Sequence, residues 1–394
     1  MELAEWPYFA EDEVQAVKEV LHCGRVNYWT GDRCKLFEQQ FAQYLGVKHA
    51  ISVANGTVAL ELALRALEIG PGDEVIVPCK TFIATASAVV AQGAKPVLAD
   101  IDQDSQTLTL ATIEAQRTSR TKAIIVVHLG GWPADVPAIM AYANQHNLYV
   151  IEDCAQAHGA TINGQKVGSF GHINAFSFCQ DKILSTGGEG GLVVTNDEKL
   201  WSLAWAYKDH GKNYHTVFHK HHNPGFRYLH EDFGTNFRMT EMQAAIGIKQ
   251  LEKLPNWLAL RTRNALCLYK AIKNLAAFRM PMPAAHIQHA FYRFYVFVNP
   301  DFLKSDWNRE RIILTLNESG VPCTVGGCAE IYLEQAFIKH QLVPKKRFLN
   351  AQILNETSLA FLVHPTLTES MMEQMAATIV DVAQMATRQI LVTT

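Results

Sequence analysis

The sequence lacks the features of exported and membrane proteins. Residues 1–7 have neither the charged stretch nor the apolar stretch of a signal peptide. No apolar run approaches the ~20 residues that a membrane-spanning helix requires. The eight cysteines form no C-x-x-C pair and no zinc-ligand spacing, so free thiols are expected. These absences predict a cytoplasmic protein that does not associate with membranes.

An excess of one charge sign is also missing. The chain has 35 Lys and Arg against 38 Asp and Glu, and its basic residues are scattered. Nucleic-acid-binding proteins gather such residues in patches or add a basic helix-turn-helix segment, and neither is visible here. We therefore expect no nucleic-acid partner, which argues against a cofactor-binding transcription regulator. Internal repeats, low-complexity tracts and Gly/Ser linkers are absent as well.

Histidine is locally abundant between residues 210 and 230. His215 and His219 have the i, i+4 spacing that binds metal on a helix. However, the Asn-Pro-Gly sequence at 223–225 predicts a long loop, and no carboxylate is spaced as an orienting partner. We predict no metal site.

The 394 residues are enough for one large core and a smaller second one. Short β-branched runs alternate with helical patterns, which predicts a doubly wound, mainly parallel sheet covered on both faces. The runs are 50–53, 75–77, 96–98, 123–127 and 149–151.

A helical pattern from Met239 to Lys273, broken at Pro255, leads into a second α/β unit. That unit is expected to contain a strand at 291–298 and helices at 308–319 and 369–389. The predicted domains are residues 1–255, with the large sheet, and residues 256–394, with the smaller unit.

Lys182 stands between the apolar strand 175–179 and the glycine run 187–191. An amine held at a strand end beside close-approach backbone is suited to forming a Schiff base with an aldehyde cofactor. The ordinary alternative is a solvated surface lysine.

Asp153 follows the apolar run 148–151, so it lies at the carboxyl end of a buried strand, where open α/β sheets bind ligands. A carboxylate at that depth needs a partner, and a protonated pyridine nitrogen would be one. The alternative is a cap of the next helix.

Two further segments each follow the end of a predicted strand. Asn55-Gly56-Thr57 opens a helix, whose N-terminus favours phosphate, although an ordinary turn and cap would look the same. The segment 78–82 places Phe82 where its ring could cover a flat cofactor, unless it packs in the core.

In this order, these segments resemble the sugar aminotransferases of the DegT/DnrJ/EryC1/StrS type. The resemblance extends from Asn27-Tyr28-Trp29-Thr30-Gly31 through the segments above to residues 234–241. It implies the type I, aspartate aminotransferase-like fold, with a large pyridoxal 5′-phosphate-binding domain and a smaller C-terminal α/β domain. It also implies a homodimer whose subunits share their active sites.

The family pattern, carried over by position, implies a role for each residue of the site. The position of Phe82 is Trp or Tyr in other members. Lys182 forms the Schiff base, Asp153 pairs with the pyridine nitrogen, Gln156 bonds the phenolic oxygen, Phe82 stacks on the ring, Gly56, Thr57 and Ser177 hold the phosphate, and Asn236 reaches in from the neighbouring subunit.

The resemblance further implies transfer of an amino group from glutamate to a nucleotide-linked 4-keto-6-deoxyhexose, giving a 4-amino-4,6-dideoxyhexose for O-antigen or another glycan. A 3-keto sugar is the alternative acceptor. Loop 320–334 departs from the His-Tyr-x-Pro pattern of many members, and its Glu330 and Tyr332 are candidate sugar contacts or helix-surface residues. A sugar dehydratase offshoot carries His where this chain has Lys182, and an inactive scaffold would not need Lys182 and Asp153.

Overall fold

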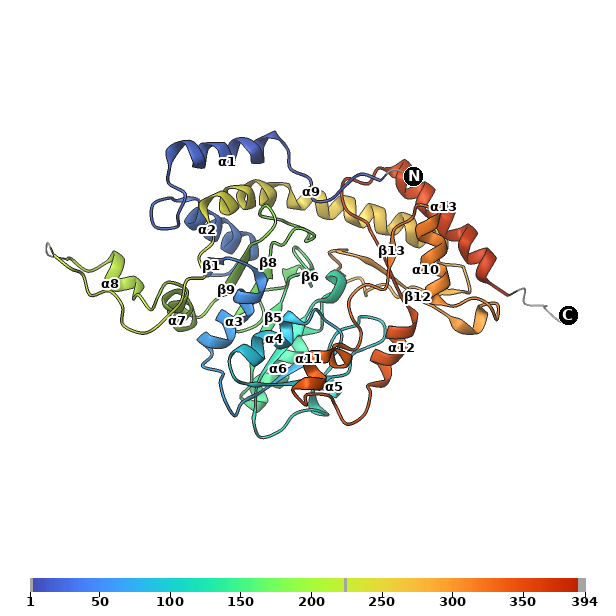
Figure 1. Ribbon diagram of the computed structural model, residues 1–394, viewed down its shortest axis with the longest axis horizontal. Coiled ribbons are helices and arrows are strands. Elements are labelled where there is room, and N and C mark those ends of the chain that lie inside the picture. The colour runs from blue at the N-terminus through green and yellow to red at the C-terminus, as the bar shows by residue number, and fades with distance from the viewer. Residues whose placement is uncertain (1–2, 223–224, 389–394) are drawn as a thin grey trace.

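The computed structural model describes residues 3–222 and 225–388. A seven-stranded sheet in the order β1-β9-β8-β5-β4-β2-β3 forms the centre of the large domain (Figure 1). Only β9 runs antiparallel to its neighbours. The doubly wound, mainly parallel sheet predicted from the sequence is confirmed. Its strands are β1 (His49–Val53), β2 (Glu74–Pro78), β3 (Lys95–Ala99), β4 (Thr121–Val127), β5 (Tyr149–Asp153), β8 (Asn174–Ser177) and β9 (Gly191–Thr195).

Helices cover both faces of this sheet because its strands are apolar on both sides. Alternate residues of β2 and β4 belong to different hydrophobic clusters: Val75 and Val77 pack with the helices α3, α4 and α7, whereas Ile76 packs with α5 and α6. Helices α2 and α9 cover the second face at β1, β8 and β9. The helices of the large domain are α1 (Glu11–Cys23), α2 (Arg33–Leu45), α3 (Gly56–Ala66), α4 (Ala84–Ala91), α5 (Leu110–Glu114), α6 (Val136–His146), α7 (Glu198–Lys208) and α8 (Tyr214–Phe218).

The C-terminal part forms the smaller α/β unit around an antiparallel sheet in the order β10-β12-β14-β13. The strand and helices expected there are present, and the predicted end at Gln389 lies outside the described residues. The elements are β10 (Phe278–Arg279), β12 (Phe294–Val298), α10 (Arg309–Glu318), β13 (Cys323–Thr324), α11 (Gln335–Lys339), α12 (Leu349–Thr357), β14 (Ser358–Phe361) and α13 (Glu369–Ala386). A small sheet of β11 (Ile287–Gln288), β6 (Thr161–Ile162) and β7 (Gln165–Lys166) joins the two parts.

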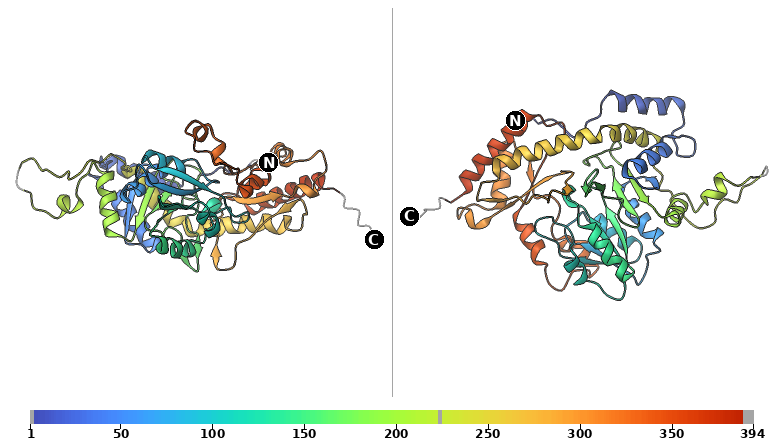
Figure 2. Two further views of the ribbon diagram at one scale, coloured as in Figure 1. Left: turned by 90° about the horizontal axis from the view of Figure 1, so that it is seen from below. Right: turned by 180° about the vertical axis from the view of Figure 1, so that it is seen from behind.

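Helix α9 (Glu241–Ile272) connects the two units without interruption, so the predicted break at Pro255 is wrong. Proline removes one N–H from the helix ladder. Here the helix is held on both sides of that position, because Leu251 and Leu254 pack in the large domain and Leu268 in the small one. Figures 1 and 2 show α9 as one rod spanning the molecule, with α1 alongside it. The domain boundary at 255/256 remains a prediction.

The histidine-rich stretch was expected to be loop throughout. It contains the short helix α8, which begins at the Asn213 cap and ends before His219. The arm that carries α8 projects from the body of the large domain (Figure 1). Among the described residues, no helix is long and apolar enough to span a bilayer. All eight cysteines are unpaired, as expected.

Candidate active site

Lys182 lies in the loop that follows β8, and two backbone contacts fix its position. Its N–H donates to Cys179 O at 3.1 Å, which closes a turn, and its carbonyl accepts from the Trp6 indole at 2.9 Å. Its side chain is only 16% exposed. The solvated surface lysine is therefore excluded. The Trp6 contact comes from the far N-terminal segment and has no local sequence signal.

The Lys182 amine has charged and aromatic neighbours. Its Nζ lies 3.5 Å from Asp181 Oδ1 and 5.2 Å from the centre of the Tyr292 ring. The Tyr292 hydroxyl donates to Asp181 Oδ2, so the three side chains form one connected group. Sequence reasoning gave no role to Asp181 or Tyr292.

Asp153 ends β5 and is buried. The Thr85 hydroxyl donates to its Oδ2 at 2.9 Å, and the Ala155 N–H donates to its Oδ1 at 3.2 Å. Burial raises the pKa of Asp153 above its ordinary value, and these hydrogen bonds, together with the charge of Lys182, offset that only in part. A further cation beside Asp153 would therefore stabilise its ionised carboxylate. Thr85, at the start of α4, was not recognised from the sequence.

The predicted phosphate ligands lie together. Gly56 begins α3, and the Asn55 side chain caps the helix by accepting from Val58 N at 3.0 Å. A Cβ on Gly56 would lie 2.5 Å from the Ser177 Cβ, so the two backbones meet only because residue 56 is glycine. The first N–H groups of a helix have no partner within it. Gly56 and Ser177 therefore meet where α3 presents its free N–H groups, next to Thr57, a setting that suits an anion.

The other three predicted cofactor contacts are Phe82, Gln156 and Asn236, and their environments differ. Phe82 is 68% exposed, so it is not a core residue and its ring is free to stack. Gln156 accepts from Gly130 N at 2.7 Å through its side-chain oxygen. Asn236 is exposed and bonds only Arg238 N within the described part of its own chain.

Glu330 and Tyr332 are not helix-surface residues, because both are buried. The Tyr332 hydroxyl donates to Glu330 and accepts from Phe348 N at 3.2 Å. Arg347 binds both oxygens of Glu330 at 2.9 and 2.6 Å. These contacts commit both side chains to partners within the chain and close the segment 330–348 on itself, while Tyr332 also packs in a hydrophobic cluster of the large domain. Their contact with a sugar remains a prediction without support from this placement.

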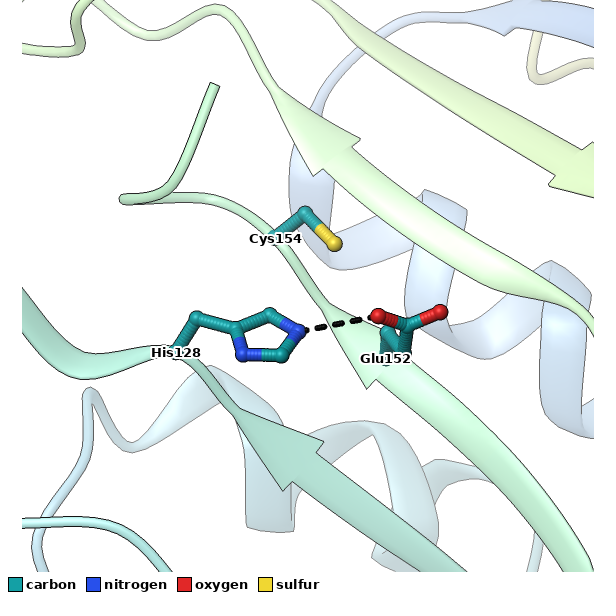
Figure 3. A group of neighbouring side chains, drawn as sticks. All are labelled: His128, Glu152 and Cys154. Atoms are coloured by element: carbon teal, nitrogen blue, oxygen red, sulfur yellow. Dashed lines mark hydrogen bonds and ion pairs between the residues drawn. The ribbon is translucent and has the colours of Figure 1, made fainter. Parts of the chain in front are cut away.

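One group of metal-type ligands occurs among the described residues, and its chemistry does not fit a metal (Figure 3). His128 Nδ1 accepts from Ala134 N at 3.1 Å, so Nε2 carries the proton that it donates to Glu152 at 3.0 Å. Glu152 also accepts from three backbone N–H groups at 168, 170 and 171. Burial raises the pKa of the Cys154 thiol, so it is not a thiolate. The group ties the ends of β4 and β5 together. His215 and His219 belong to no such group.

The comparisons with known proteins agree with this geometry. Residues 7–380 match the DegT/DnrJ/EryC1/StrS aminotransferase family. The chain belongs to this family. It is 45% identical over 285 residues to a UDP-N-acetyl-3-dehydro-alpha-D-glucosamine 3-aminotransferase of Acidithiobacillus ferrooxidans, covering 72% of this chain and 73% of that protein. It is 49% identical over 227 residues to a GDP-perosamine synthase of Caulobacter vibrioides, covering 58% of each chain. The solved aminotransferase of Psychrobacter cryohalolentis superposes with a TM-score of 0.95 at 51% identity, covering 97% of this chain and 98% of that one.

Membership of the DegT/DnrJ/EryC1/StrS family makes the chain a pyridoxal 5′-phosphate-dependent aminotransferase of the type I fold. Its relatives are nucleotide-sugar aminotransferases. The residues present fit the cofactor on three counts: Lys182 offers an amine for the aldehyde, Asp153 is a buried carboxylate short of a cation, and the Gly56 corner suits a phosphate.

The close contact at Gly56 carries a first prediction. Gly56→Ala would force its Cβ against Ser177, so we expect ~1–3 kcal/mol of destabilisation and weaker retention of the cofactor. Gly70→Ala is the matched control, because the nearest atom to its Cβ is 3.9 Å away. Thermal unfolding and titration with pyridoxal phosphate measure both effects. Equal behaviour of the two variants would show that residues 56 and 177 do not meet.

Proposed function

We propose that this aminotransferase moves the amino group of glutamate to a nucleotide-linked keto-deoxyhexose. The observation that carries the proposal is the gathering of Lys182, Asp153 and the α3 N-terminus at the carboxyl ends of β5, β8 and β1. An amine, a buried carboxylate and an anion corner at one edge of a parallel sheet are what a cofactor with an aldehyde, a basic ring nitrogen and a phosphate requires. The family relatives that act on nucleotide sugars support the acceptor class.

Each residue has a defined task. Bound pyridoxal phosphate supplies an electron-withdrawing ring that takes up charge from the reacting carbon. Asp153 keeps the ring nitrogen protonated, and Gly56, Thr57 and Ser177 anchor the phosphate so that the ring does not shift. Phe82 would stack on the ring, and Gln156 would bind its phenolic oxygen. The free amine of Lys182 would act as the acid–base group, accepting a proton from the carbon of the amino donor in the first half of the reaction and donating one to the sugar carbon in the second.

The acceptor carbon has two candidates, carbon 3 and carbon 4. The Acidithiobacillus enzyme is named for a 3-amino product, and the Caulobacter enzyme makes GDP-perosamine. The departure of loop 320–334 from the family pattern favours carbon 4, but Glu330 and Tyr332 of this loop bind other residues of the chain. A 4-keto-6-deoxyhexose and a 3-keto sugar are therefore both proposed as acceptors. The dehydratase alternative lacks support, because its histidine is Lys182 here.

Product analysis tests the proposal. The purified protein is incubated with glutamate and a panel of nucleotide-linked 3-keto and 4-keto sugars, and the products are examined by mass spectrometry and NMR. We expect an amino sugar from one member of the panel and 2-oxoglutarate in equal amount. Loss of a sugar hydroxyl without gain of nitrogen would establish the dehydratase instead.

The proposed dimer makes a second prediction, because Asn236 is assigned to the neighbouring subunit's phosphate. Lys182→Ala and Asn236→Ala chains are each expected to be impaired alone. In a heterodimer, the site with an intact Lys182 receives an intact Asn236 from its partner. Equal mixing with subunit exchange should therefore restore about a quarter of the wild-type activity. No recovery, or full activity in a demonstrated monomer, would place the whole site within one chain.

A further inference from the structure

The residue before the candidate Schiff-base lysine is an aspartate whose carboxylate lies against the lysine amine. Side chains of adjacent residues usually diverge, but the turn closed by Lys182 N and Cys179 O brings these two together. Lys182 Nζ is 3.5 Å from Asp181 Oδ1, and no other ion pair of Lys182 occurs among the described residues. The pair thus lies within the site, with one member already assigned and the other without a role.

Asp181 is held from its other side by residues 292 and 293, in the segment that leads into β12. The Tyr292 hydroxyl donates to its Oδ2, and Arg293 Nη2 lies 4.0 Å from the same oxygen. Tyr292 is buried, so the grip on Asp181 is fixed by the packing of the segment that enters β12. The carboxylate is therefore oriented, even though it is half exposed to solvent.

The charges around the pair keep the carboxylate ionised. Burial raises the pKa of Asp181, but Lys182, the Tyr292 hydroxyl and Arg293 outweigh it and leave the pKa below its usual value. The face of the Tyr292 ring, 5.2 Å from Lys182 Nζ, also favours a cation. The remaining titratable groups that interact with the lysine charge are the buried Asp153 and His158.

We propose that Asp181 is a positioning residue that pairs with the free amine of Lys182 and holds it in place beside the cofactor pocket, with Tyr292 fixing the carboxylate. This inference rests on the proposed role of Lys182. Its consequence is that a proton taken up by the amine is held at Nζ, paired with Asp181, until the amine delivers it within the same half of the reaction. Removing the Asp181 charge would take this ion-pair partner away from the amine.

The test is trace acetylation of the cofactor-free protein at several pH values, with the Lys182 peptide quantified by mass spectrometry. Only the unprotonated amine reacts. We expect Asp181→Asn to raise the labelling of Lys182 at pH 8 about fivefold, the upper end of the effect expected of a partly exposed ion pair. Tyr292→Phe keeps the Asp181 charge but removes the hydroxyl that orients the carboxylate, so a smaller rise in Lys182 labelling is expected. Asp306→Asn removes the charge of another exposed ion pair, with Arg311, and should leave Lys182 labelling unchanged.

Unchanged or slower labelling in Asp181→Asn would overturn the proposal; if that variant does not fold, unchanged labelling in Tyr292→Phe does so. With cofactor bound, the pH at which the visible absorption band changes should move lower in Asp181→Asn, a shift that a purely structural role would not cause. Because the labelling is done without cofactor, it does not depend on what Lys182 binds. Borohydride fixation of the cofactor on a residue other than Lys182 would instead refute the assignment under the proposed function.

Discussion

Lys182→Ala is expected to lower turnover by at least about 10⁴-fold, ~5.5 kcal/mol of barrier, because the variant loses both the amine that links the cofactor and the group that moves the proton. Turnover is measured with glutamate and the active sugar of the panel. The wild-type protein should be yellow and, after borohydride treatment, should carry the cofactor on the Lys182 peptide. Lys182→Arg keeps the positive charge beside Asp181 but cannot form the link, so it controls for loss of the ion pair. A wild-type rate in Lys182→Ala would overturn the assignment.

Asp153→Asn should lower turnover by about 10²–10⁴-fold while the fold is kept, because the amide still accepts from Thr85 but cannot hold the ring nitrogen protonated. Thr85→Val removes only the hydrogen bond to Oδ2, and a loss of less than about tenfold is expected. The ratio of the two effects separates the charge of Asp153 from its placement. Equal rates in Asp153→Asn and wild type would mean that another group pairs with the nitrogen.

Asp153→Asn should also change the stability of the cofactor-free protein, and here the expected change is a gain. The folded-state pKa of Asp153 is raised by burial, so between the unfolded and folded pKa values the folded state binds more protons. Stability is therefore lost as the pH rises through the folded pKa, and asparagine, which does not ionise, avoids this loss. Thermal unfolding without cofactor should show Asp153→Asn gaining on wild type from pH 4 towards neutral pH. A constant difference across that range would contradict the raised pKa.

Sequence reasoning predicted the large sheet and the positions of Lys182, Asp153 and Gly56 because these depend on local patterns: β-branched runs, strand ends and turns. The structure brings them to one edge of the sheet, as the parallel topology requires. What the sequence could not supply are contacts between distant segments. Trp6 reaches Lys182 across 176 residues, and Tyr292 reaches Asp181 across 111. Such pairings depend on tertiary packing, which leaves no periodic signal in one chain.

Two predictions in the C-terminal half, the helix break at Pro255 and the sugar contacts at Glu330 and Tyr332, have outcomes with a physical explanation. The missing N–H of Pro255 predicts a helix break, yet packing on both sides of this residue keeps α9 continuous. Glu330 and Tyr332 were chosen as polar residues in a loop that departs from the family pattern. Their polar atoms instead satisfy one another and Arg347, which a sequence pattern cannot distinguish from polar atoms facing a substrate.

The uninterrupted α9 also limits how the enzyme can respond to its substrates. A hinge between the two units at Pro255 would require unwinding a helix whose buried side chains belong to both hydrophobic cores. The large and small units should therefore behave as one mechanical body, with opening and closing left to side chains and surface loops. In calorimetry, such a chain is expected to melt in a single transition, since neither core can lose its share of α9 while the other keeps it.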